Sequence, residues 1–165
     1  MKLWLTVLVF FIVTSSVHAG GPTLPKQYRQ PTEDELSADW RKGDPDKYAS
    51  IAADFNGDGL VDGCFLVVDK KQHKLVIVVV LFNKFDDSET WLKLQTMDYD
   101  ALKYQGIALV KPSTVSVYMG KASEDRKQPK TLNFNSIESF SSEGPSSIFF
   151  WDPSKLQFQH YWLTK

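Results

Sequence analysis

The residues with the clearest chemical pattern lie in one stretch, Asp-Phe-Asn-Gly-Asp-Gly-Leu-Val-Asp, at positions 54–62. Oxygen-bearing side chains recur there at every second position, and Gly59 follows where the chain must reverse sharply and a Cβ would resist. This spacing predicts a site for a hard cation such as Ca²⁺, which takes six to eight oxygen ligands at about 2.3–2.6 Å. The expected ligands are the side chains of Asp54, Asn56, Asp58 and Asp62 and the main-chain carbonyl of Leu60.

The stretch departs from an EF-hand after its ninth residue. An EF-hand loop needs a bidentate Glu at its twelfth position and an incoming helix. Here the twelfth position is Phe65, the start of an apolar, β-branched run that predicts a strand. Residues 53–68, ADFNGDGLVDGCFLVV, resemble the calcium loop of FG-GAP or VCBS-type repeats, best known from integrin-like β-propellers. The resemblance covers a single unit and implies Ca²⁺ held between two strands; an ordinary surface turn without metal is the alternative.

The N-terminus has the pattern of a secretory signal peptide, which we expect to cover residues 1–19. Lys2 gives a positive start, an apolar run follows from Leu3 to Val13, and Val17-His18-Ala19 forms a cleavage site. The apolar run is too short to span a bilayer, which needs about 20 residues. We therefore expect a periplasmic or secreted protein without a membrane anchor after cleavage; a retained N-terminal anchor is the alternative.

Composition predicts one folded domain over residues 32–165, preceded by a Pro-rich linker or arm at 20–31. Hydrophobic residues make up 42% of the chain and charged residues 24%, which argues against wholesale disorder. The formal net charge of −1 shows no basic excess, so nucleic acid is not an expected partner. The one cysteine, Cys64, lies in a predicted strand, and we expect a buried, inert thiol.

The periodicity of the chain predicts a mostly β fold with one short N-terminal helix. Thr32 and Glu35 form a capping-box pattern, and the helix is expected to run to about Trp40. The residues from Leu75 to Phe82 are apolar at nearly every position, which predicts a central strand buried on both faces. Further strands are expected at 48–53, 63–69, 91–95, 107–110, 114–119, 131–134, 136–140, 147–151 and 156–162. The expected architecture is small antiparallel sheets, propeller-like or sandwich-like; a single calcium loop argues against a full propeller.

Motifs for catalysis are few. The sequence has no G-x-S-x-G elbow, no H-E-x-x-H pair and no P-loop. Carboxylate pairs occur at Asp86 and Asp87 and at Asp98 and Asp100, but both pairs lie in polar connections typical of surface turns. We therefore expect no enzyme activity. The alternative is a hydrolase of polysaccharide or peptidoglycan that uses a carboxylate pair near the calcium.

The sequence thus favours an exported, non-enzymatic, calcium-binding β protein that binds a protein partner. In architecture and localisation it looks similar to periplasmic inhibitors of cell-wall hydrolases and to immunity proteins that neutralise toxins. Such targets are often basic, and the acidic segment from Glu33 to Asp62 would steer them. Four side chains suited to anchoring an interface are the expected partner-binding residues: Trp40, Arg41, Tyr104 and Tyr161. An adhesion module is a third reading, but such modules normally occur in tandem.

Overall fold

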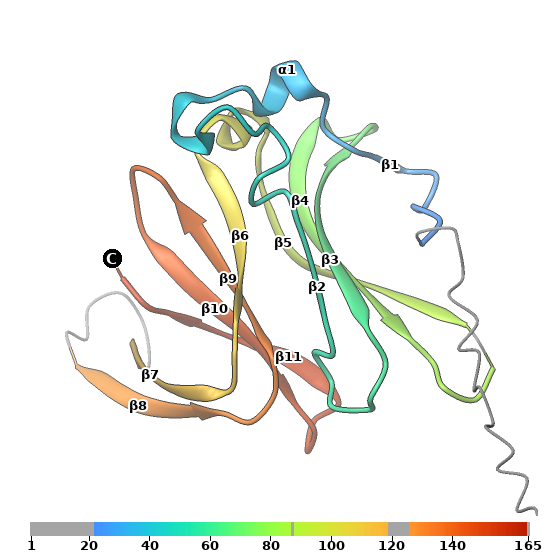
Figure 1. Cartoon of the computed structure of the whole chain (residues 1–165), viewed down its shortest axis with the longest axis vertical. Helices are drawn as coiled ribbons and strands as arrows, with labels where there is room; N and C mark the ends of the chain where they lie inside the picture. The colour runs from blue at the N-terminus through green and yellow to red at the C-terminus, as the bar shows by residue number, and fades with distance from the viewer. Residues whose placement is uncertain (1–21, 87, 119–125, 165) are drawn as a thin grey trace, which may run out of the picture.

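The computed structural model of the chain describes residues 22–86, 88–118 and 126–164, so the signal peptide expected at 1–19 lies outside the described residues. Two antiparallel sheets pack face to face (Figure 1). In the first sheet the order is β1-β3-β4-β5, and β2 pairs with the opposite end of β3 from β1. Its strands are β1 (Tyr28–Arg29), β2 (Ser50–Ala53), β3 (Asp62–Asp69), β4 (Lys74–Phe82) and β5 (Glu89–Asp98).

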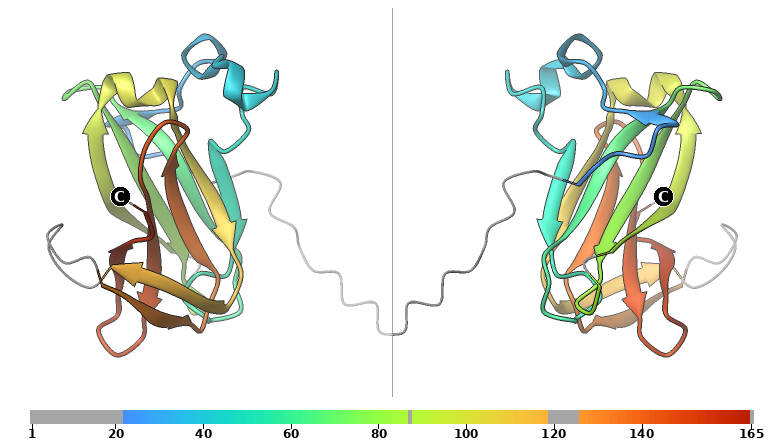
Figure 2. Two further views of the ribbon diagram at one scale, coloured as in Figure 1. Left: turned by 90° about the vertical axis from the view of Figure 1, so that its left-hand side faces the viewer. Right: turned by 90° about the vertical axis from the view of Figure 1, so that its right-hand side faces the viewer.

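The second sheet has six strands in the order β6-β9-β10-β11-β7-β8. They are β6 (Gln105–Val110), β7 (Ser113–Tyr118), β8 (Lys127–Leu132), β9 (Ser136–Ser141), β10 (Ser146–Asp152) and β11 (Gln157–Trp162). Among the described residues, one residue pair, Trp162 with Tyr118, joins β11 to β7. The β7–β8 hairpin consequently bends across the lower end of the molecule (Figure 2). The sheet curls into a half-barrel around a small core of its own, built on Val117, Leu132, Ile148 and Phe150.

Strand β4 lies at the centre of the first sheet, and the prediction that both of its faces are buried is confirmed. Residues from Leu75 to Leu81 are all buried. Leu75, Ile77 and Val79 face the core between the sheets. Val76 and Val78 point to the other face, where they form a small cluster with Val67. Leu24 and Tyr28 of the N-terminal segment pack on this cluster. The fold is therefore mostly β, with sheets stacked face to face; the described residues form no blades around a channel.

The N-terminal segment is ordered against the first sheet, in contrast to the loose arm that its Pro-rich composition predicts. Tyr28 pairs with Asp69, and Leu24 and Tyr28 pack on the outer cluster of that sheet. Helix α1 (Glu33–Leu36) starts with the predicted capping box between Thr32 and Glu35. It ends four residues earlier than expected, and the short 3₁₀ turn η1 (Asp39–Arg41) follows. A second 3₁₀ turn, η2 (Tyr99–Lys103), lies beside α1 at the upper end of the molecule (Figure 1).

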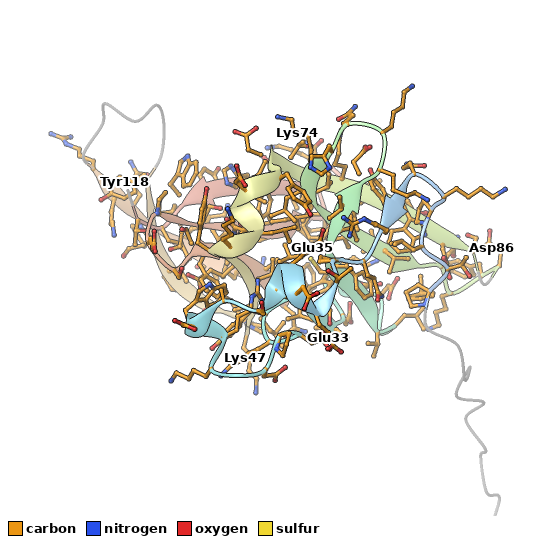
Figure 3. The ribbon with its side chains drawn as sticks, turned by 90° about the horizontal axis from the view of Figure 1, so that it is seen from above. Glu33, Glu35, Lys47, Lys74, Asp86 and Tyr118 are labelled. Carbon is orange, nitrogen blue, oxygen red and sulfur yellow. The ribbon has the colours of Figure 1, made fainter. Side chains whose placement is uncertain are left out.

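Glu35 joins these three upper segments. Both of its carboxylate oxygens accept hydrogen bonds from Arg29 at 2.7 Å, and the Tyr99 hydroxyl donates to the same carboxylate. The Arg29 hydrogen bonds, with smaller contributions from Tyr99 and Thr32, lower the pKa of Glu35 to about 2. Glu35 lies on α1 (Figure 3), and Arg29 lies on β1. The ion pair between Arg29 and Glu35 therefore ties the N-terminal segment to α1.

One strand was misplaced by the sequence patterns. Residues 120–129 have the composition of a polar, basic loop, and the next strand is expected at 131–134. In the structure β8 begins at Lys127 and contains Pro129. The strand lies at the edge of its sheet, where a residue without an N–H costs no ladder hydrogen bond.

Candidate functional site

The predicted cation loop connects β2 to β3 at the lower end of the molecule (Figure 1). Its three alternating polar side chains all fold back on the loop's own backbone. The Asp54 carboxylate accepts the N–H groups of Gly57 and Gly59 at 2.6 and 2.9 Å. The Asn56 side-chain oxygen accepts from Asp58 N–H at 3.0 Å, and the Asp58 carboxylate accepts from Leu60 N–H at 2.8 Å. These bonds turn the chain around a small volume bordered by side-chain oxygens.

The loop is fixed to the second sheet by the connection between β8 and β9. The Asn135 side chain donates to the Asp54 carbonyl at 3.0 Å. Gly57 has a φ of +80°, and a Cβ at this position would meet the ring of Phe134. Phe55 is fully buried in the core between the sheets. The loop is thus held from both sides, and its shape depends on residues about 80 positions later in the chain.

Asp62 closes the loop from within the protein. It is 1% exposed, and its carboxylate accepts from Phe55 N–H at 2.9 Å and from Phe82 N–H at 3.1 Å. Burial raises the pKa of Asp62 to about 6, although these two hydrogen bonds oppose the rise. The negative charges of Asp58 and Asp54 add to it. Negative charge therefore accumulates at the loop, and a bound cation would relieve it.

The donors present fit Ca²⁺ in kind. Across the described ranges no group of three or more His, Cys, Asp and Glu side chains is arranged to hold a metal ion. Asp54, Asn56 and Asp58 supply oxygens, and each accepting oxygen keeps a second lone pair beside the N–H that it accepts. Asp62 differs from these three expected ligands, because one of its oxygens accepts a hydrogen bond from Phe55 N–H and the other from Phe82 N–H. Ligation of an ion by Asp62 would have to share these oxygens.

Two of the expected partner-binding residues, Arg41 and Trp40, make contacts within the fold. Arg41 is 1% exposed, and its guanidinium donates to the carbonyls of Lys47 and Gln105, the latter at 2.7 Å. A buried guanidinium cannot contact a protein partner, so the prediction that Arg41 is a partner-binding residue is wrong. Trp40 is half-buried; it stacks on Tyr48 and donates from Nε1 to the Lys103 carbonyl at 2.7 Å. The structure does not bring either residue next to Tyr161.

The other two expected residues lie on different faces of the second sheet. Tyr161 packs with the half-barrel core, where its ring stacks on Phe150 with centroids 5.6 Å apart. Tyr104 follows η2, is 37% exposed and lines a groove of about 380 Å³ between the sheets. The sequence reasoning missed most of this groove, because its other polar residues are serines and glutamines in strands rather than a motif.

Three of the four carboxylates of the hydrolase alternative are described, and Asp86, Asp98 and Asp100 all lie on the surface. Asp86 and Asp98 are exposed, and hydrogen bonds from Ser88 and from Lys74, respectively, lower their pKa values. Asp87 lies outside the described residues. The predicted inert thiol is confirmed as buried: Cys64 packs in the core, and burial raises its pKa.

Comparison with known proteins identifies no relative: no known protein family, no curated protein and no solved structure matches this chain. Within the described residues, no helix is long and apolar enough to cross a membrane.

Proposed function

We propose that this chain is an exported, non-enzymatic β protein that binds Ca²⁺ in the 54–62 loop and recognises a protein partner. The observation that carries the proposal is the wrapping of the loop around the alternating oxygens of Asp54, Asn56 and Asp58. Turn chemistry accounts for the glycines and for the N–H groups that Asp54, Asn56 and Asp58 accept. The calcium assignment is supported by the position of these oxygens beside Asp62, whose pKa is raised by burial and further by the charges of Asp58 and Asp54. The resemblance to an FG-GAP or VCBS-type loop supports the same assignment.

In this proposal the ion has a structural role. The loop joins the start of β3, the end of β4 and the β8–β9 connection through hydrogen bonds from Phe55, Phe82 and Asn135. An ion that cancels the charge of Asp54 and Asp58 would hold these segments together more firmly. Ligation that exists only in the native state stabilises that state by RT ln(1 + [L]/Kd), about 2.7 kcal/mol at 100 times Kd.

Thermal unfolding with Ca²⁺, with Mg²⁺ and with chelator tests the metal assignment. We expect Ca²⁺ to raise the Tm of the wild type above its value in chelator, and Asp58→Ala to abolish this difference. The matched control is Asp86→Ala, because Asp86 also accepts bonds from its own turn but lies away from the loop. The control should keep the full response to Ca²⁺. Equal melting curves for wild type with Ca²⁺ and with chelator would refute the calcium site.

The proposed partner is a toxin or a cell-wall hydrolase that the protein inhibits. Export is expected from residues 1–19, and the acidic residues of α1, η1 and the calcium loop supply attraction for a basic target. Trp40, Tyr104 and Tyr161 remain the proposed contact residues, on separate patches. Affinity capture with periplasmic extract, repeated with Tyr104→Ala, tests this role. Recovery of no stable partner together with turnover of a cell-wall substrate would favour the hydrolase instead.

The described carboxylates favour the non-enzymatic form of the proposal. A general acid in glycoside hydrolysis needs a raised pKa and access to substrate. Asp62 has the raised pKa but is buried, with its oxygens bonded to Phe55 and Phe82. The accessible Asp86 and Asp98 have lowered pKa values.

A further inference from the structure

The two sheets are closed along one side and open along the other. On the closed side β2 lies against β6, and Ile107 N–H donates to the Tyr48 carbonyl at 2.9 Å. On the open side a groove runs between β5 and the β10–β11 hairpin. It consists of two hollows of about 250 and 380 Å³ that follow each other along β5 and β11. We call these two hollows together the β5–β11 groove.

The floor of the β5–β11 groove is polar where a β core is normally apolar. Gln105 and Ser139 are buried there, and the Gln105 amide donates to the Ser139 hydroxyl at 2.8 Å. The Ser139 hydroxyl in turn donates to the Gln95 side-chain oxygen at 3.2 Å, which leaves the Gln95 amide nitrogen for another acceptor. Ser147 is 1% exposed and lines the groove, and its hydroxyl bonds to no other side chain in the described part of the chain. Gln105 and Ser139 are satisfied by each other and by Gln95, so the floor's groups that can bond to a ligand are the Ser147 hydroxyl and the Gln95 amide nitrogen.

A β-bulge places the amide of Gln95 in the groove. Lys93 pairs with Val78 and Gln95 pairs with Ile77, so Leu94 is an extra residue on β5. A bulge of this kind shifts the alternation of side chains between the two faces. Leu92, before the bulge, and Leu94, at the bulge, therefore both pack on the core, while Gln95 and Met97 line the groove after it.

The wall of the groove opposite β5 is a row of rings. Phe158, His160 and Trp162 alternate along β11 and share one face. His160 stacks on Phe149 with centroids 4.5 Å apart, and Trp162 meets His160 edge-to-face at 5.3 Å. Trp162 is 39% exposed. At about 3.4 Å per strand residue, the four steps from Phe158 to Trp162 extend over roughly 14 Å, longer than a single sugar ring.

The chemistry of the groove fits a neutral ligand with many hydroxyls. The charged side chains that line it, Lys93 and Asp98, are exposed, and Asp98 is paired with Lys74 at 2.6 Å. A buried charge on a ligand would find no partner on the floor. The C–H faces of a sugar pack on aromatic faces, and its hydroxyls both donate to and accept from amides and hydroxyls. We propose that the β5–β11 groove binds a neutral oligosaccharide, with sugar rings on Trp162 and His160 and hydroxyls bonded to Ser147 and Gln95.

An extended peptide added to the edge of β5 is the competing occupant, and the bulge argues against it. Strand β5 pairs only with β4, so its outer edge is free within the described residues. A bulge at Leu94 and the charge of Lys93 are the devices that block strand addition at exposed edges. The oligosaccharide needs no regular backbone on β5. This inference goes beyond the proposed function and involves none of the calcium ligands.

Isothermal titration calorimetry of the exported chain with three hexasaccharides tests the inference: chitohexaose, cellohexaose and maltohexaose. We expect at least one to bind saturably. Trp162→Ala and Ser147→Ala should each weaken that binding tenfold or more, while Trp162→Phe, which keeps a ring, should lose less. Phe85→Ala is the matched control, because Phe85 is an exposed aromatic residue in the β4–β5 connection, outside the groove, and its removal should leave binding unchanged.

The thermal melting curve of each variant checks that the variant is folded. Ser147→Ala removes a single oxygen atom, so this variant still tests the proposal if Trp162→Ala unfolds the protein. Failure of all three sugars to bind the wild type would overturn the proposal. Binding that is unchanged in both Trp162→Phe and Ser147→Ala would do the same. The competing result would be that no sugar binds, while peptides selected for binding to the wild type fail to bind Lys93→Pro. This result would replace the oligosaccharide with a peptide strand added to the edge of β5.

Discussion

Replacement of Gly57 by alanine should destabilise the protein far more than the same replacement of Gly59, although both lie in the same loop. Both residues have positive φ, +80° and +89°. This conformation costs a non-glycine residue about 1–2 kcal/mol. The positions differ in their surroundings: a Cβ on Gly59 meets nothing within 4 Å, whereas a Cβ on Gly57 would lie 2.8 Å or closer to three ring carbons of Phe134.

The additional cost at Gly57 is that of overpacking. Extra carbon atoms forced into a packed site cost about 1–3 kcal/mol. We therefore expect Gly57→Ala to lower the free energy of unfolding by about 2–5 kcal/mol and Gly59→Ala by about 1–2 kcal/mol. Urea denaturation in the presence of chelator measures both values without a contribution from Ca²⁺.

A double-mutant cycle identifies the source of the difference. In the Phe134→Leu background the ring is absent, so Gly57→Ala should cost little more than Gly59→Ala. Equal costs for the two glycine variants in the wild-type background would refute the packing of the loop against Phe134. An undiminished cost of Gly57→Ala in the Phe134→Leu background would show that backbone conformation, and not the ring, is responsible.

Three further predictions follow from the buried and paired residues. Phe55→Ala removes a fully buried ring from the core and should cost about 3–5 kcal/mol in urea denaturation; a cost below about 1 kcal/mol would show that the loop is not packed in the core. Because the pKa of Glu35 is lowered from 4.5 to about 2, its stabilisation is present above pH 4.5 and is lost as the pH falls towards 2. Arg29 is 35% exposed, so the loss should be only about 1 kcal/mol, and Glu35→Gln should remove this part of the pH dependence of Tm. Cys64 should react with iodoacetamide only as fast as the protein unfolds, since it is buried and its pKa is raised; rapid labelling of the native protein would contradict its place in the core.

The features that the sequence predicted correctly are those set by neighbouring residues. The capping box of Thr32 and Glu35 needs only a four-residue stretch. Strand β4 was predictable because its apolar run is short and rich in β-branched Val and Ile, which favours a strand covered on both faces. The tight turn at 54–62 was likewise predictable from local spacing, because Asp and Asn at alternate positions fold back onto the loop's own N–H groups. Its binding of Ca²⁺ stays a prediction.

The features that the sequence patterns missed depend on contacts between distant segments. Arg41 looks like a surface charge beside Lys42, but its guanidinium reaches the carbonyl of Gln105, 64 positions later. The polar β5–β11 groove arises from a bulge at Leu94, and nothing in an alternating strand pattern indicates where an extra residue will fall. The packing of Gly57 on Phe134 similarly depends on how two sheets meet, which periodicity does not describe.

The position of β11 has a consequence for the order in which the protein can fold. Among the described strands it is the last in the chain, yet it lies inside its sheet, between β10 on one side and β7 on the other. As the chain emerges from a ribosome or an export channel, β6, β9 and β10 can pair, and β7 can pair with β8. In the strand order of the described residues, β11 is the strand that joins these two groups. Until β11 is synthesised, Phe150 and Ile148 lack the contact with its Tyr161, so this apolar surface is completed by the last strand to be synthesised among those described.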